Sequence, residues 1–65
     1  MDRTTPLQYL ISGRNQSGFV NLGRSTPSAA LKKAREFLQE GYLDVRICTP
    51  RGMVLAPEEF YQLDG

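Results

Sequence analysis

The sequence contains no histidine, and its 65 residues include a single cysteine, Cys48. An internal disulfide therefore cannot form, and one thiol without histidine lacks the ligands that a structural zinc ion requires. Histidine is also the commonest general base in enzymes, so its absence weighs against catalysis. We expect a protein without enzymatic activity and without a metal or other cofactor.

Charge of one sign is not in excess, and long apolar runs are lacking. Eight basic and seven acidic residues give a formal net charge of +1, whereas a small nucleic-acid binder usually carries a clear basic excess. No apolar run approaches the roughly 20 residues of a membrane-spanning helix, and residues 1–6 do not resemble a signal peptide. A lone cysteine fits a reducing compartment. These features favour a cytoplasmic protein with no membrane partner.

The chain is short for a domain that folds alone. A domain of this size buries roughly 60% of the surface that its unfolded chain exposes. Without a disulfide or a metal, an efficient core or a second subunit has to supply stability. We expect one domain over residues 1–65, with residues 1–6 as a disordered lead-in, and a homodimer is the first assembly to test.

The clearest local signal is a helix over residues 27–40. Thr26 suits the N-cap, and Pro27 suits the first helical position, where a missing N–H costs nothing. Gly41 fits the left-handed position that ends a helix. Apolar residues recur every three to four positions, which predicts one buried face. They are Ala30, Leu31, Ala34, Phe37 and Leu38.

Two alternating segments before the helix predict a hairpin. Residues 7–13 and 19–22 are separated by a polar turn over residues 14–18. In the second strand Val20 and Leu22 are the better core pair, although Phe19 is buried instead if the register differs by one.

A second hairpin is predicted after the helix. Residues 43–49 alternate, with Leu43, Val45, Ile47 and Thr49 on one face. A turn over residues 50–52 has a proline and a glycine where a type I turn with a G1 bulge needs them. Residues 53–56 form the fourth strand. Residues 57–61 form a short helical turn, with acidic residues at its favourable N-terminal end.

These elements predict an α+β fold in β-β-α-β-β order. We expect a four-stranded, mostly antiparallel sheet with one helix packed on one face and a short C-terminal helical turn. The preferred strand order is 2-1-3-4, and 2-1-4-3 is the main alternative.

The strands carry more apolar residues than one helix can cover. Some of them must point away from the helix, which leaves an open, partly apolar face. The alternatives are that Tyr61 and Leu63 fold over this face, or that its apolar residues are merely scattered. Such a face in so small a protein indicates an interface. We therefore predict a protein-interaction module that self-associates as a homodimer or binds another protein. The predicted interface consists of Leu10, Phe19, Arg46, Cys48 and either Met53 or Val54, with Met53 preferred.

A nucleic-acid-binding domain is the alternative from another class, because small sheets backed by a helix contact DNA and RNA. Against it, Asp44 shares a strand face with Arg46, and no aromatic cluster alternates with the basic residues. Its candidate contacts are Arg14, Arg24, Arg46 and Arg51.

A reactive thiol at Cys48 is a third hypothesis, and a small apolar strand residue is the favoured interpretation of that cysteine.

Four segments are shared with a known kind of protein: Gly18-Phe19, the Thr-led helix from Thr26 to Ala34, Pro50 to Gly52, and Glu58 to Phe60. Through them the run from Tyr9 to Phe60 resembles small bacterial proteins of unknown function with the same β-β-α-β-β order. The resemblance implies the fold and assigns no activity, cofactor or site residue.

Overall fold

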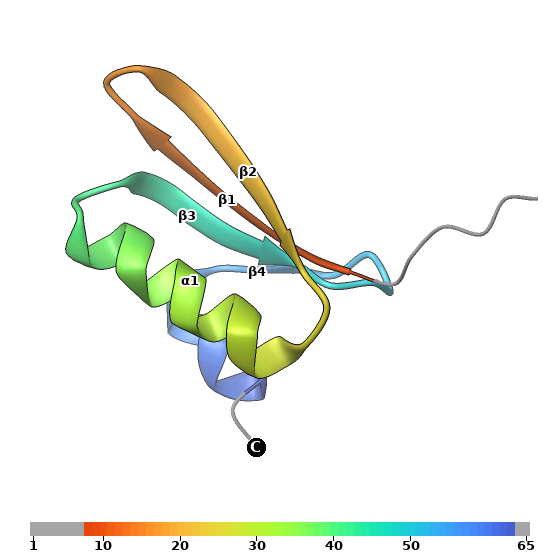
Figure 1. The fold of residues 1–65 in the computed structure, drawn as a ribbon. Coiled ribbons are helices and arrows are strands. Elements are labelled where there is room, and N and C mark those ends of the chain that lie inside the picture. The colour runs from red at the N-terminus through yellow and green to blue at the C-terminus, as the bar shows by residue number, and fades with distance from the viewer. Residues whose placement is uncertain (1–7, 64–65) are drawn as a thin grey trace, which may run out of the picture.

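The computed structural model describes residues 8–63 and shows an α+β fold (Figure 1). One antiparallel sheet has the strand order β2-β1-β3-β4, which confirms the preferred prediction. The expected lead-in at residues 1–6 lies outside the described residues. The elements are β1 (Tyr9–Asn15), β2 (Gly18–Arg24), α1 (Pro27–Gln39), β3 (Leu43–Cys48), β4 (Val54–Leu55) and the 3-10 helix η1 (Pro57–Leu63).

The first hairpin turns more tightly than the sequence indicated. Only Gln16 and Ser17 lie between the strands, so β1 runs two residues beyond its predicted end and β2 begins one residue early. The Asn15 side chain explains the tighter turn, because its Oδ1 accepts the Ser17 N–H at 2.8 Å. Asparagine commonly holds the backbone two residues on in this way.

The pairing of β1 with β2 settles which residues of β2 face the helix. Gly13 pairs with Val20 and Ile11 with Leu22. Val20 and Leu22 pack against the core, while Phe19 is 75% exposed. The prediction that Val20 and Leu22 are the core pair is therefore confirmed.

A β-bulge in β3 overturns one expectation. Ser12 pairs with Arg46 and Arg14 with Leu43, so β3 has one residue more than β1 between these pairs. Asp44, in this interval, has a φ of 55°. The prediction that Leu43 shares a face with Val45 was wrong, because the bulge places Leu43 beside Arg14 and leaves it 58% exposed.

The core lies between the sheet and the two helices. Leu38 does not belong to it: it is 41% exposed at the margin of the helix stripe, contrary to the prediction. Phe60 of η1 and Leu55 of β4 complete the core instead. The buried residues are Ile11, Ala30, Leu31, Ala34, Phe37, Val45, Ile47, Leu55 and Phe60.

The second turn has the predicted geometry. The Gly52 N–H donates to the Thr49 carbonyl at 2.9 Å, and Gly52 has a φ of 93°. The Thr49 N–H donates to the Met53 carbonyl at 2.7 Å. The strand that follows, β4, has two residues instead of the predicted four. Pro57 begins η1 as predicted, and this helix continues two residues past the predicted end.

A capped helix end positions α1 on the sheet. The Tyr42 N–H donates to the Phe37 carbonyl and the Gly41 N–H to the Leu38 carbonyl, which is a Schellman motif with Gly41 at φ 85°. The rings of Phe37 and Tyr42 stack with centroids 4.5 Å apart. Both rings lie over Gly13 of β1, where a Cβ would be 2.9 Å from Tyr42 Cδ2 and 3.1 Å from Phe37 Cδ2. Only glycine at position 13 leaves room for both rings against β1.

Gly13→Ala should lower the free energy of unfolding by about 1–3 kcal/mol, because the added methyl group overpacks the two rings. Urea unfolding measures the change. In a Tyr42→Ala background the same substitution should cost much less, since the nearest ring atom is gone. An equal cost in both backgrounds would contradict this contact.

Candidate functional site

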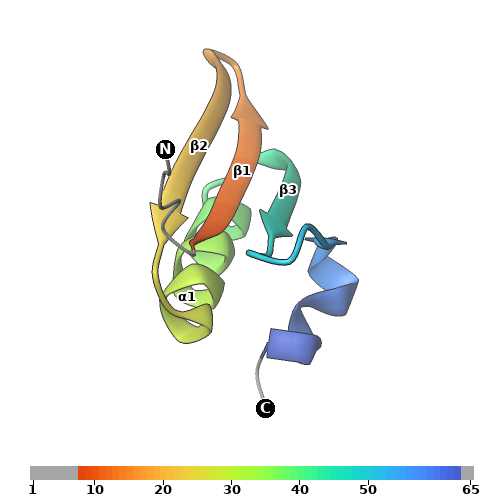
Figure 2. The same cartoon turned by 90° about the vertical axis from the view of Figure 1, so that its right-hand side faces the viewer.

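One face of the sheet has no described element over it. Both α1 and η1 pack on the other face, and η1 also contacts α1 (Figures 1 and 2). In Figure 2 the lower part of β1 passes in front of α1. Tyr61 is 70% exposed and Leu63 packs against the core, so the alternative in which these two residues cover the open side is wrong. We call the side opposite α1 the open face.

An apolar row crosses the open face near the start of β1. Leu10 pairs with Gly23 on one side and with Cys48 on the other, and Cys48 pairs with Val54. Paired residues of antiparallel strands point to the same face. Leu10 is 46% and Val54 61% exposed, while Cys48 is half-buried between them. Leu10, Cys48 and Val54 form what we call the apolar row.

Polar residues fill the middle of the open face. Ser12 pairs with Asn21 of β2 and with Arg46 of β3. The Arg46 guanidinium donates to the Val45 carbonyl at 2.9 Å, and this bond holds the guanidinium close to the backbone of β3. This second row therefore offers hydroxyl, amide and guanidinium groups beside the apolar row.

Phe19 lies at the far end of the open face, away from the apolar row. It pairs with Arg14, whose guanidinium bonds Asp44 through Nη2 at 2.9 Å and Nε at 3.1 Å. Both charged side chains are about half exposed, so their attraction is largely screened. The predicted interface includes both Phe19 and Leu10, whereas in the structure the row of Ser12, Asn21 and Arg46 separates these two residues.

Met53 is the one predicted interface residue that lies elsewhere. It lines a hollow together with Tyr9, Pro27 and Pro50, at the end of the sheet beside the start of α1. Because Val54 pairs with Cys48, Val54 points to the open face instead of Met53. The sequence left the choice between Met53 and Val54 open, because it depends on how the loop at residues 50–52 aligns the last strand with β3.

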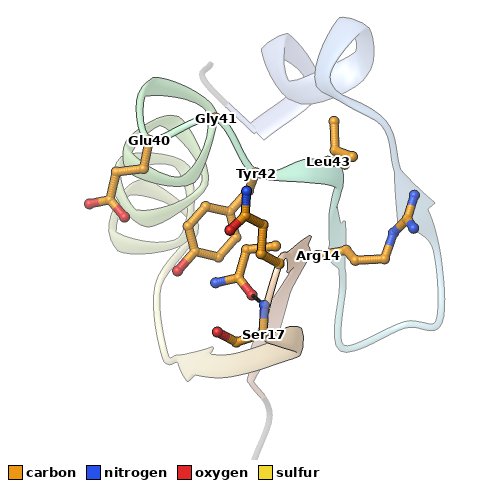
Figure 3. A pocket seen from close by; sticks show the side chains of 8 residues that line it. Arg14, Ser17, Glu40, Gly41, Tyr42 and Leu43 are labelled. Atoms are coloured by element: carbon orange, nitrogen blue, oxygen red, sulfur yellow. Dashed lines mark hydrogen bonds between the residues drawn. The ribbon is translucent and has the colours of Figure 1, made fainter.

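A polar hollow of about 770 Å³ lies between the β1–β2 turn and the end of α1 (Figure 3). Its charged side chains do not converge: Glu40 points outward on one side and Arg14 away from Tyr42 on the other (Figure 3). Asn15 is already engaged with the Ser17 N–H. The hollow therefore presents no assembled set of groups for a ligand.

The four arginines of the nucleic-acid alternative are not gathered into one patch. Arg14 and Arg46 belong to the open face, and Arg14 is paired with an acid. Arg24 lies beside α1 and donates to the Gly23 carbonyl at 2.7 Å, while Arg51 lies in the β3–β4 turn. Such dispersal gives no continuous basic surface for a phosphate backbone.

Groups that could carry chemistry are engaged in structural contacts. The Cys48 thiol donates to the Thr49 carbonyl at 3.7 Å, between two apolar neighbours. Glu59 accepts the Ala56 N–H at 3.0 Å and so caps the start of η1. Within residues 8–63, no three His, Cys, Asp or Glu residues gather where a metal ion could bind.

Neither helix within residues 8–63 has the length and hydrophobicity needed to cross a membrane.

Comparison of the chain with protein-family models, curated proteins and solved structures finds no match. The resemblance to small bacterial proteins stays a prediction.

The one perturbed acid on α1 belongs to an ion pair. The Lys33 Nζ donates to Glu36 Oε1 at 2.8 Å, and this bond, with the charge of Lys33, lowers the pKa of Glu36. Lys32 and Arg24 add weaker attractions that lower the pKa further.

A lowered pKa in the folded state means that the carboxylate stabilises the protein above its unfolded pKa, and this contribution is lost as the pH falls. We expect Glu36→Gln to flatten the decline of Tm below pH 4.5, the ordinary value for this acid. Thermal melts from pH 7 to pH 3 measure it, with Glu58→Gln as the control. An unchanged acid profile in Glu36→Gln would contradict the assignment.

Proposed function

We propose that this protein is a non-enzymatic, cytoplasmic protein-interaction module that binds a second copy of itself through the open face. The observation that carries the proposal is the apolar row, which spans three strands on the side that α1 and η1 leave uncovered. The row has the composition of an interface centre, and the neighbouring Ser12, Asn21 and Arg46 have that of a polar rim.

The exposed apolar surface of the sheet supports the same proposal. Apolar burial contributes about 25 cal/mol per Å² removed from water. In this chain the exposed apolar residues of β1 and β4 lie outside the core, so the fold itself gains little from them. A second copy with an identical row supplies the matching apolar surface, because a two-fold interface brings the same patch of both subunits together.

Self-association should depend on the two most exposed residues of the apolar row. Leu10→Ser and Val54→Ser should each raise the dimer dissociation constant about tenfold, the equivalent of losing one partly buried aliphatic side chain. Sedimentation velocity over micromolar to millimolar protein measures it. Tyr61→Ser is the matched control, since Tyr61 is 70% exposed but lies on η1.

A wild-type protein that stays monomeric at millimolar concentration would overturn the proposal. So would equal association of both apolar-row variants and the wild type.

Nucleic acid is the contrasting partner, and the dispersed arginines argue against it. We expect no salt-dependent retention of the protein on random DNA or RNA at low ionic strength. Retention that Arg46→Gln abolishes, with Arg51→Gln unchanged, would favour a nucleic-acid-binding sheet over the self-associating module.

A further inference from the structure

The two edges of the sheet differ in how well they are protected. The edge strand β4 has two residues, and the proline that begins η1 follows it after a single residue. The other edge strand, β2, has seven residues, no proline and no charged residue before Arg24 at its end. Short length, proline and charge are the usual means of keeping an edge strand from pairing with another chain. Such protection is present at β4 and missing at β2.

The register identifies the backbone groups that β2 presents at its free edge. A two-residue turn closes the hairpin on the Asn15–Gly18 pair, and hydrogen-bonded pairs then alternate along the strands. Val20 and Leu22 accordingly direct their N–H and C=O groups toward β1. Phe19, Asn21 and Gly23 direct theirs outward. The Gly23 carbonyl already accepts the Arg24 guanidinium at 2.7 Å, a bond that a second strand would replace. The other two carbonyls and the three N–H groups have no partner in the sheet.

This edge is complementary to itself. In an antiparallel arrangement centred on Asn21, each Asn21 lies opposite the Asn21 of the second copy, and each Phe19 lies opposite a Gly23. All three outward positions then pair with outward positions. On the helix side Val20 lies opposite Leu22, so two half-buried apolar residues of each copy gain a neighbour. Arg24 lies opposite Gly18, and no like charges face each other across the junction.

We infer that the β2 strands of two copies pair antiparallel about Asn21 and form one continuous eight-stranded sheet. Both helices then lie on the same side, and the two open faces join into a single surface. Each Phe19 ring, 75% exposed in one copy, lies across from Gly23 of the other, where it meets the Gln8 side chain that covers this glycine. This junction leaves both apolar rows uncovered on the joined surface, so it is a separate contact from the one in the proposed function. The inference rests on the proposed self-association, and the two contacts together predict a dimer of dimers.

A cysteine at the centre of the junction tests the register directly. Across an antiparallel hydrogen-bonded pair the Cα atoms lie about 5.5 Å apart, which a disulfide can bridge. In a Cys48→Ala background, which removes the thiol and keeps the apolar row apolar, Asn21→Cys should form a covalent dimer under mild oxidation with glutathione. Gln16→Cys in the same background is the matched control, because Gln16 lies in the turn away from the centre.

Proline at the same position removes the outward donor without removing a bond to β1. Asn21→Pro should raise the dissociation constant of the β2 junction about tenfold or more, so that sedimentation velocity shows open-face dimers in place of the dimer of dimers. Asn21→Thr, which keeps the N–H, should change this constant less than about threefold. Circular dichroism checks that each variant is folded. If Asn21→Pro does not fold, the cysteine pair still decides the register.

Cross-linking of Asn21→Cys no faster than of Gln16→Cys would overturn the inference. The proposed function fails separately: it is refuted if Leu10→Ser and Val54→Ser leave association intact. Loss of the dimer in these two variants, together with no effect of Asn21→Pro and no cross-link, would retain the open face and refute the β2 junction.

Discussion

The stack of Phe37 and Tyr42 over Gly13 is the contact on which the rest of the structure depends. The left-handed Gly41 ends α1 and brings Tyr42 back beneath Phe37. Both rings then occupy the space that any side chain at Gly13 would need. This contact assigns α1 to one face of the sheet, and the opposite face is thereby left without a described cover.

The β-bulge in β3 lies beside the same contact and shapes the open face. Because β3 has an extra residue opposite Gly13, Leu43 turns to the side of Arg14, and Asp44 reaches the Arg14 guanidinium. Beyond the bulge the register is regular, so Leu10, Cys48 and Val54 align across three strands. One local irregularity therefore separates a polar, ion-paired end of the face from an apolar end.

Two kinds of unsatisfied surface coexist in this small protein. The apolar row is exposed side-chain surface, which the hydrophobic effect favours covering. The β2 edge is exposed backbone, which water satisfies at little cost but which another strand satisfies with directional bonds. A contact through the apolar row tolerates several relative orientations of the two copies. A contact through the β2 edge requires one strand register. The two surfaces therefore respond to different substitutions.

The sequence by itself determined the elements with strong local signals: the helix begun by Thr26 and ended at Gly41, the turn at Gly52, and the β-β-α-β-β order. It also identified Leu10 and Cys48 as residues facing away from the helix, since strict alternation is a local property. Only the tertiary structure decided the rest. The bulge that exposes Leu43, the choice of Val54 over Met53 and the distance of Phe19 from the apolar row all depend on cross-strand register. Register follows from contacts between residues far apart in the chain, and no local pattern encodes it.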